Sequence, residues 1–559
     1  MNRIWISRYP TGVPTEVDVA AYRSICDVFD ASVRKFGPRA AFVNMGTALS
    51  YSQIDGMARD FAAYLQAVLK LPRGARVALM MPNVLQYPIA MFGALRGGYT
   101  VVNCNPLYTP RELKLQLDDS GAEAMVVVEN FARVVERAMG SSSVRHVLVT
   151  GLGDLLGFPS GPMINFIVKY VKRLVPTWHI PGAVGFRSAL RQGAGAPFER
   201  VDVGPDDLAF LQYTGGTTGV PKGAMLSHGN IVANLQQAHA WLRPVLEEGR
   251  EVVITALPLY HVFALTANCM TFLKIGATNV LVTNPRDIPR MVKELGRHRF
   301  TVITGVNTLF NALLNNADFA RLDFTPLRLS VGGGMAIQKA VAERWKRVTG
   351  HALLEGYGLT ETSPFVSMNP LDLADFNGTI GLPVPSTDVA IRDDDDADLP
   401  IGEVGELCVR GPQVMKGYWH RPSETALAMT GDGYLRTGDL ATIDEAGFLR
   451  IVDRKKDMMI VSGFNVYPSE LEDVMAMCPR ILESAAFGVP DPASGQAIKV
   501  AIVRKDPTLS SQEVIAHCRE HLTGYKIPRY VEFRSELPKT AVGKVLRRAL
   551  AEEAAKAAA

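Results

Sequence analysis

The sequence has few cysteines, little net charge and no long apolar run. Its six cysteines are scattered and form no C-x-x-C pair, which argues against a metal site and against a disulfide framework. A formal net charge of +3, all of it located after residue 453, is too small to indicate a nucleic-acid partner. The first ten residues lack the apolar core of a signal peptide, so we expect a cytoplasmic protein.

The composition is that of a folded globular protein. Apolar residues make up 47% of the chain and charged residues 21%, so neither a disordered chain nor an integral membrane protein is indicated. A length of 559 residues exceeds what one hydrophobic core supports, which predicts at least two domains.

Strand-like and helix-like segments alternate in the first half of the chain. Apolar runs at 76–81, 100–103 and 124–128 are separated by helical patterns at 85–95 and 111–117. The strand pattern returns at 251–257 and 301–304. Such alternation predicts an α/β fold with buried parallel sheets.

The sequence pattern changes between residues 399 and 451. Short strand-like pieces at 405–410 and 447–452, separated by glycine and proline, predict a small antiparallel or β-barrel-like subdomain. The cation-rich stretch Asp453–Asp457 follows and is either a hinge or an ordinary charged linker. We therefore expect a large domain at 1–453 and a small, mobile α+β domain at 454–559.

An amphipathic helix is predicted at 163–175. Apolar residues recur there at helical spacing, whereas Lys169, Lys172 and Arg173 lie off the apolar stripe. The segment is too short to span a bilayer, and Pro176 ends it. It is either a surface helix packed on the core or a helix that docks on the inner face of an anionic membrane.

The most informative motif is Tyr213-Thr-Gly-Gly-Thr-Thr-Gly-Val-Pro-Lys-Gly223. Its glycines let backbone N–H groups converge on an anion, and its hydroxyls and lysine add further donors. A Walker A loop has Ser or Thr directly after Gly-Lys, whereas Gly223 follows the lysine here. We therefore predict phosphate binding of another kind, by Tyr213, Thr214, Gly215, Gly216, Thr217, Thr218, Gly219 and Lys222.

A second group of motifs completes a nucleotide site. Gly332–Gly334 follows an apolar run and allows close approach of a flat ligand, which makes Gly333 and Gly334 candidates. In the stretch 355–362, Tyr357 can stack on a base, Thr360 can donate to a phosphate and Glu361 can hold Mg²⁺. The remaining candidates of this stretch are Glu355, Gly356 and Gly358.

Two further residues complete the candidate set. Asp439 follows a tight turn and is suited to accepting hydrogen bonds from ribose hydroxyls, and Lys544 follows a glycine near the C-terminus. Taken alone, Lys544 would be interpreted as a surface residue.

Together, the motifs at 213–223, 357–362, 437–439, 453–457 and Lys544 resemble the adenylate-forming superfamily, in the same order along the chain. The stretches 81–87, 105–111, 256–264 and 461–468 resemble bacterial long-chain fatty acid–CoA ligases within it. The resemblance implies ATP, Mg²⁺ and CoA as partners of a long-chain fatty acid. It also implies formation of acyl-CoA through an acyl-adenylate, feeding fatty-acid degradation.

The resemblance also implies roles for individual residues. Thr214 joins Glu361 at the metal, Lys544 orients the attack of the carboxylate, and His261 orients the acyl substrate. Arg454 joins Asp439 at the ribose, and Lys456 or its neighbours absorb a rotation of the small domain. Gly463 and Phe464 then line the CoA channel. Lys526 and Arg529 are either contacts of the CoA phosphates or surface charges.

Two alternatives stay open from sequence. A fatty acyl-AMP ligase that loads a carrier protein would use the same first half-reaction, and a lipid-binding protein without catalysis would retain only the fold. A homodimer is compatible with the sequence, which does not decide the oligomeric state.

Overall fold

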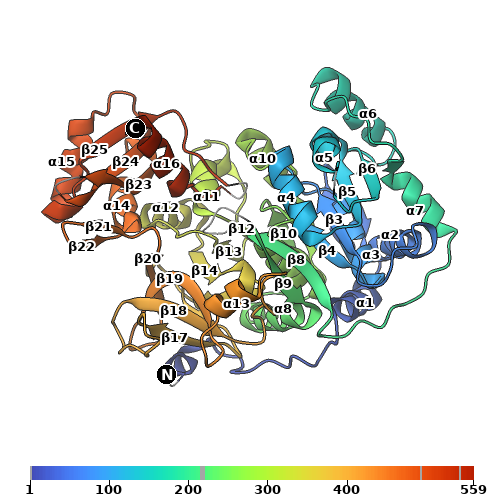
Figure 1. The fold of residues 1–559 in the computed structure, drawn as a ribbon, viewed down its shortest axis with the longest axis horizontal. Helices are drawn as coiled ribbons and strands as arrows, with labels where there is room; N and C mark the ends of the chain where they lie inside the picture. The colour runs from blue at the N-terminus through green and yellow to red at the C-terminus, as the bar shows by residue number, and fades with distance from the viewer. Residues whose placement is uncertain (1–2, 141, 215–220, 492–493, 541–542, 559) are drawn as a thin grey trace.

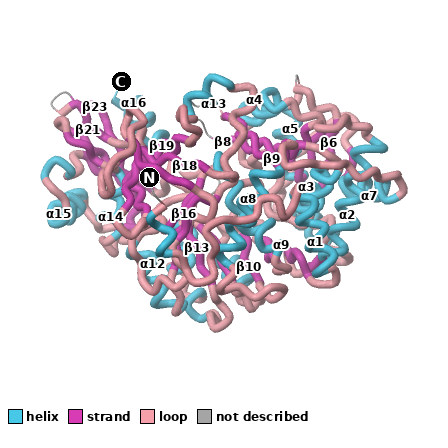
Figure 2. Tube along the Cα trace, turned by 90° about the horizontal axis from the view of Figure 1, so that it is seen from below, coloured by secondary structure: helices cyan, strands magenta, loops and turns pink. Residues whose placement is uncertain are grey.

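The computed structural model describes residues 3–140, 142–214, 221–491, 494–540 and 543–558 (Figure 1). Two large sheets and a smaller antiparallel sheet form the body of the molecule, and the C-terminal residues form a separate lobe at one end (Figures 1 and 2). This arrangement confirms the predicted α/β class, with a large N-terminal part and a small C-terminal part.

The first large sheet has seven strands, and all neighbours are parallel except the last pair. Its central strands are buried along their whole length, which explains their continuous apolar sequences. In spatial order the strands are β7 (Val184–Gly185), β6 (His146–Thr150), β5 (Ala124–Val128), β3 (Arg76–Met80), β4 (Thr100–Asn103), β8 (Leu208–Thr214) and β9 (Lys222–Ser227).

The second large sheet has nine strands, with a parallel centre and antiparallel edges. In spatial order they are β16 (Leu382–Pro383), β15 (Phe365–Met368), β14 (Leu353–Gly358), β13 (Leu329–Gly332), β12 (Val302–Gly305), β10 (Val252–Thr255), β11 (Thr278–Leu281), β1 (Ala40–Asn44) and β2 (Thr47–Ser50). The predicted strands near 251–257 and 301–304 are β10 and β12.

A layer of helices separates the two large sheets. Helix α3 (Gln86–Arg96) contacts β3 and β4, its neighbour α2 (Tyr51–Ala63) contacts β1 and β2, and α8 (His228–Leu242) contacts both β9 and β15. Every residue of α3 except Arg96 is buried. The two parallel sheets therefore share one continuous core.

The other helices of the large domain lie around this core (Figure 1). They are α1 (Ile25–Phe36), α4 (Pro110–Ser120), α5 (Ala132–Ala138), α6 (Ser160–Phe166), α7 (Phe186–Ala194), α9 (Phe272–Lys274), α10 (Ile288–Leu295), α11 (Asn307–Leu314), α12 (Lys339–Thr349) and α13 (Pro422–Ala428), with the π-helical segment η5 (Phe263–Thr271) ahead of α9.

The predicted small β subdomain is an antiparallel sheet of four strands. In spatial order they are β17 (Asp388–Arg392), β18 (Gly405–Arg410), β19 (Leu435–Ile443) and β20 (Leu449–Arg454). The sheet is open, with β17 and β20 at its edges, so its strands do not close into a barrel.

The C-terminal lobe has its own sheet and its own core. The strands β22 (Phe464–Val466), β21 (Met459–Val461), β24 (Gly495–Arg504) and β23 (Ile481–Asp491) form the main path, and β25 (Tyr530–Arg534) pairs with β24. The helices are α14 (Pro468–Ala476), α15 (Ser511–His521) and α16 (Arg547–Ala558). The change from one sheet to the next occurs between Arg454 and Met459, next to the domain boundary that we place after residue 453.

The amphipathic segment is helical, and Ile164 packs against the core, but most of the predicted apolar stripe is exposed. Helix α6 continues as the π-helical segment η4 (Ile167–Val171), at the outer edge of the molecule at the top of Figure 1. Phe166, Tyr170 and Val171 are 57%, 63% and 65% exposed. Among the described residues, no helix is long and apolar enough to cross a membrane.

A half-buried arginine ties the C-terminal lobe to the linker. Arg547 donates to both carboxylate oxygens of Glu472, at 2.8 and 2.6 Å, and to Asp453 Oδ1 at 3.1 Å. Asp453 Oδ2 also accepts from Ser469 N at 2.8 Å. Removing one member of such a buried charge network leaves the others uncompensated.

We expect Arg547→Ala to lower the free energy of unfolding of the C-terminal lobe by about 3 kcal/mol, because Glu472 and the almost fully buried Asp453 lose their counter-ion. Urea denaturation measures this change. The neighbouring Arg548→Ala is the matched control, since Arg548 is exposed and pairs with Glu552 at the helix surface. Equal destabilisation by both variants would contradict the assigned role.

Candidate active site

The main cavity of the described structure has a volume of about 1240 Å³ and lies at the carboxyl ends of strands from both large sheets. Strands β8, β12, β13 and β14 all contribute residues there, as expected for a ligand site in an α/β fold. The small antiparallel sheet and the C-terminal lobe close the opposite side with Thr437, Arg454 and Lys544.

The two ends of the phosphate motif face this cavity. Thr214 ends β8 and Lys222 begins β9, and the antiparallel register pairs them directly. The predicted residues Gly215, Gly216, Thr217, Thr218 and Gly219 fall outside the described residues. Lys222 forms an ion pair with Glu424 of α13, and its Nζ lies 5.3 Å from the centroid of the Tyr418 ring.

An aspartate not found by sequence analysis supports the phosphate strand. Asp119 accepts from Tyr213 Oη at 2.7 Å through one carboxylate oxygen and from Arg421 at 3.0 Å through the other. It lies in the last turn of α4, which begins at a capping box formed by Thr109 and Glu112. Tyr213 is therefore held in place by a helix that is far away in sequence.

The predicted metal residue Glu361 lines the cavity within a short 3₁₀ turn, η7 (Thr360–Thr362). Its Oε1 accepts from Tyr418 Oη at 2.8 Å, and Thr360 lines the cavity beside it. The turn depends on Gly358, where a Cβ would lie 1.8 Å from the carbonyl oxygen of Pro364. Glu361 and Thr214, predicted together at Mg²⁺, line the same cavity.

The predicted ribose and base residues form a connected group. Tyr357 Oη donates to Asp439 Oδ2 at 2.6 Å, and Arg454 Nε lies 3.0 Å from Asp439 Oδ1. Tyr357 and Arg454 line the cavity, whereas Asp439 is almost fully buried behind them. Asp439 therefore orients these two side chains.

The glycine segment after β13 also lines the cavity. Gly333 and Gly334 face it, together with Gly356 and Gly358 of β14. The predicted residue Glu355 is absent from the cavity lining, because its side chain is buried and accepts from Ile337 N at 3.2 Å. Burial raises the pKa of Glu355 to about 8, so it carries a proton at neutral pH. Its hydrogen bond with Ile337 N holds the backbone that follows the glycine segment.

Lys544 extends into the cavity from a tight turn of the C-terminal lobe. Thr540 closes the turn, since its N donates to Lys544 O at 2.7 Å and its Oγ1 accepts from Lys544 N at 3.1 Å. Gly543 adopts φ +89°, which only glycine adopts readily, and its carbonyl accepts from Thr308 Oγ1 at 3.2 Å. Thr308 thus contacts the C-terminal lobe directly.

Burial shifts the pKa values of two residues that line the cavity, Lys544 and His261. It lowers the pKa of Lys544 to about 8, and the nearby Arg454 guanidinium acts in the same direction. Burial, followed by the charge of Lys544, lowers the pKa of His261 to about 4. His261 is therefore neutral at physiological pH, which suits the predicted orienting role and not that of a general acid.

The cavity continues as an apolar arm between α8 and the nine-stranded sheet. The lining residues of this arm are Ala238 and Leu242 of α8, Leu329 and Met368 of the sheet, and Phe272 of α9. His261 and Val306 line the same cavity. One continuous space thus joins a polar, cation-containing end to an apolar end.

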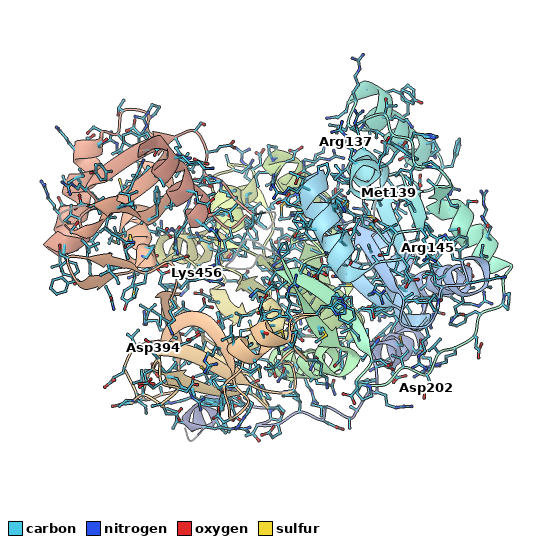
Figure 3. The ribbon with its side chains drawn as sticks, in the orientation of Figure 1. Arg137, Met139, Arg145, Asp202, Asp394 and Lys456 are labelled. Atoms are coloured by element: carbon cyan, nitrogen blue, oxygen red, sulfur yellow. The ribbon has the colours of Figure 1, made fainter. Side chains whose placement is uncertain are left out.

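The residues predicted for CoA are not brought to this site. Gly463, Phe464 and Lys526 are absent from the lining of the cavity that Lys544 enters. Phe464 is 55% exposed and stacks on Tyr525 with ring centroids 4.7 Å apart, and Lys526 pairs with Glu470 at 2.7 Å. Lys456, next to the strand end at Arg454, lies between the two lobes and lines the cavity (Figure 3).

Models of known protein families match both parts of the chain. The model described as "AMP-binding enzyme" matches residues 29–419, and the model of the AMP-binding enzyme C-terminal domain matches residues 470–544. The chain belongs to the AMP-binding enzyme family. The motifs at Tyr213, Glu361 and Lys544 all lie within the matched ranges.

Relatives of this AMP-binding enzyme match it over its whole length. A long-chain-fatty-acid–CoA ligase of Escherichia coli O6:H1 is 57% identical over 99% of each chain. The Yersinia pestis protein of the same name is 57% identical over 100% of this chain and 99% of its own. Among solved structures, an anthranilate CoA ligase in complex with anthranoyl-AMP has a TM-score of 0.84 at 25% identity, covering 96% of this chain and all of its own.

We expect the kcat/KM of carboxylate activation to fall as the pH rises through about 8, because Lys544 loses its proton there and no longer offsets the negative charge of the substrates. A pH profile of pyrophosphate release measures this. In Lys544→Arg the high-pH limb should move out of the accessible range, since arginine keeps its charge. A limb near pH 8 that persists in this variant would assign the titration to another group, such as Glu355.

Proposed function

We propose that this enzyme is an AMP-forming long-chain fatty acid–CoA ligase. The observation that carries the proposal is the placement of Lys544, whose ammonium group enters a cavity that is polar at one end and apolar at the other. Supporting it, the curated relatives at 54–57% identity over nearly the whole chain carry this name. The apolar arm fits an acyl chain, and the polar end fits a nucleotide.

In the first half-reaction, a carboxylate oxygen of the fatty acid attacks the α-phosphorus of ATP and pyrophosphate leaves. Both reactants are anions, so cations must offset their repulsion. Lys222 faces the leaving pyrophosphate, and Lys544 bridges the carboxylate and the α-phosphate. Tyr357 and Arg454, oriented by Asp439, hold the adenosine.

The site also offers ligands for Mg²⁺. Glu361 and Thr214 provide oxygen atoms in the same cavity, and oxygen donors are those that Mg²⁺ prefers. When bound there, the ion would neutralise charge on the phosphates. Tyr418 Oη, which donates to Glu361, keeps this carboxylate oriented.

In the second half-reaction, the CoA thiolate attacks the acyl carbonyl and AMP leaves. The Lys544 turn lines the cavity in this conformation. We infer that the C-terminal lobe rotates about the 454–457 segment to admit the thiol. The rotation would bring the exposed loop with Gly463 and Phe464 to the cavity. It would also turn Lys526 toward the phosphates of CoA.

A three-substrate assay tests the overall proposal. With ATP, palmitate and CoA, the enzyme should release palmitoyl-CoA, AMP and pyrophosphate in equal amounts. Accumulation of palmitoyl-AMP without thioester would instead support the alternative of a fatty acyl-AMP ligase that loads a carrier protein.

Lys544→Ala should lower acyl-AMP formation by about 100-fold or more, because the oriented charge at the attacking carboxylate is lost. Thioester formation from supplied acyl-AMP should stay close to that of the parent enzyme. Single-turnover assays of each half-reaction measure the two effects. Lys556→Ala, which removes an exposed lysine of α16, is the control and should change neither step.

The opposite pattern is expected for Phe464→Ala, which should slow thioester formation and spare adenylation. Phe464 is exposed and stacks only at the surface of the C-terminal lobe, so the fold should tolerate its removal. If Lys544→Ala and Phe464→Ala impaired both steps equally, alternation of the C-terminal lobe would be refuted.

We further propose that α6 and η4 dock on an anionic membrane surface, which gives the enzyme access to its apolar substrate. The exposed apolar residues are Phe158, Met163, Phe166, Tyr170, Val171 and Leu174. Lys169, Lys172 and Arg173 flank them, although Lys169 also pairs with Glu129 at 2.6 Å. Apolar side chains next to cations are typical of helices in a membrane interface.

Reversing the charge of Lys169, Lys172 and Arg173 to glutamate should lower the affinity for phosphatidylglycerol vesicles at least tenfold, because each basic residue near such a surface contributes about 1 kcal/mol. Co-sedimentation measures the affinity, with phosphatidylcholine vesicles as the uncharged comparison. Lys339→Glu on the distant helix α12 is the matched control. Unchanged binding of the triple variant would exclude this surface.

A further inference from the structure

A second group of chemically versatile side chains lies in the C-terminal lobe, outside the cavity. His517, Glu520 and His521 occupy the last turns of α15, and one ligand atom from each lies within 4.8 Å of the others. In the described part of the chain, no other group of three such residues meets this distance. Helix α15 is at the outer edge of the lobe in both views (Figures 1 and 2).

The spacing of these residues puts their side chains on one face of the helix. Residues separated by three and four positions are neighbours on a helix surface, and the His517 and His521 ring centroids are 5.0 Å apart. Cys518 points into the core of the lobe and is not exposed to this face. The helix begins at a capping box of Ser510 and Glu513 and is continuous to His521, so the three side chains share a regular backbone.

The second observation is that a backbone carbonyl already holds one ring nitrogen of His517. Its Nε2 lies 2.9 Å from the carbonyl oxygen of Val474 in α14, and this carbonyl can only accept a hydrogen bond. The proton is therefore on Nε2, and the lone pair is on Nδ1. Metal-binding histidines almost always donate their other N–H to a carbonyl or carboxylate, which fixes both the tautomer and the ring orientation.

The chemical nature of the three donor atoms determines which metal ion they prefer. Two imidazole nitrogens and one carboxylate oxygen are a zinc-type set, whereas Mg²⁺ and Ca²⁺ prefer oxygen donors alone. Ligand atoms about 2.1 Å from a tetrahedral ion are about 3.4 Å apart, so Glu520 and His521 need to move inward by little more than 1 Å. Both side chains are exposed and free to rotate that far. The C-terminal end of a helix also favours a cation electrostatically.

We propose that His517, Glu520 and His521 form a binding site for a zinc-type divalent cation on the C-terminal lobe. The scarcity of paired cysteines, which argued against a metal site, does not bear on a site built from histidine and glutamate. The last turn of α15 precedes Tyr525 and Lys526 by only a few residues, so an ion there would stabilise the segment on which Phe464 stacks.

Titration of the full-length enzyme with Zn²⁺ in excess Mg²⁺, followed by calorimetry, tests the site. We expect one Zn²⁺ per chain at this position and a thermal transition raised by about 2–4 °C at saturation. His521→Gln should weaken this binding at least about tenfold and remove the thermal shift. His517→Gln should do the same, and Glu520→Gln should have a smaller effect in the same direction.

Two control variants separate this site from other zinc ligands. Glu294 of α10 and His298, which lies just beyond the end of this helix, form an i,i+4 pair without a third ligand, so His298→Gln should leave Zn²⁺ binding unchanged. Cys478→Ser tests the one partly exposed cysteine and should also have no effect. Undiminished binding in His521→Gln, or loss of binding in Cys478→Ser alone, would overturn the proposal.

Discussion

The arrangement of the whole active site depends on one buried cation, the ammonium group of Lys544. Burial in the cavity disfavours its charged form and lowers its pKa, so placing the charged group there costs free energy. Asp439 and Asp457 offset this cost in part. An anionic substrate would offset it fully, because a carboxylate next to an ammonium group stabilises the charged form of both. The buried ammonium group therefore favours the binding of anions in this cavity.

Lys544 reaches the cavity because the C-terminal lobe is docked against helix α11 of the large domain. Thr308 and Asn311 of α11 hold the lobe through the carbonyl oxygens of Gly543 and Leu482. In the docked position, the charge of Asp473 in α14 adds to the burial that raises the pKa of Glu355. Burial, followed by the charge of Glu472, raises the pKa of Asp473 to about 6. These contacts are few and polar, which suits a docking that has to be reversible.

Much of the fold and the polar end of the site could be predicted from sequence. Continuous apolar runs identify the strands β3, β4 and β5, and the ordered motifs around Tyr213, Glu361 and Lys544 identify the residues of the cavity. The support for these residues could not be predicted. Asp119 and Tyr418 reach the site only through tertiary packing, and neither has a local pattern that marks it. The burial of the Glu355 side chain could not be predicted for the same reason, because a motif gives the position of a residue but not the direction in which its side chain points.

A cross-link between the two lobes would show whether the docked orientation serves only the activation of the carboxylate. Asn311 Nδ2 donates to the carbonyl oxygen of Leu482 at 3.3 Å across the interface. Cysteines placed at positions 311 and 482 should form a disulfide that locks the lobe. The oxidised enzyme should then form acyl-AMP and release pyrophosphate but form acyl-CoA only after reduction. Formation of acyl-CoA at the same rate before and after reduction would show that the second half-reaction needs no movement of the lobe.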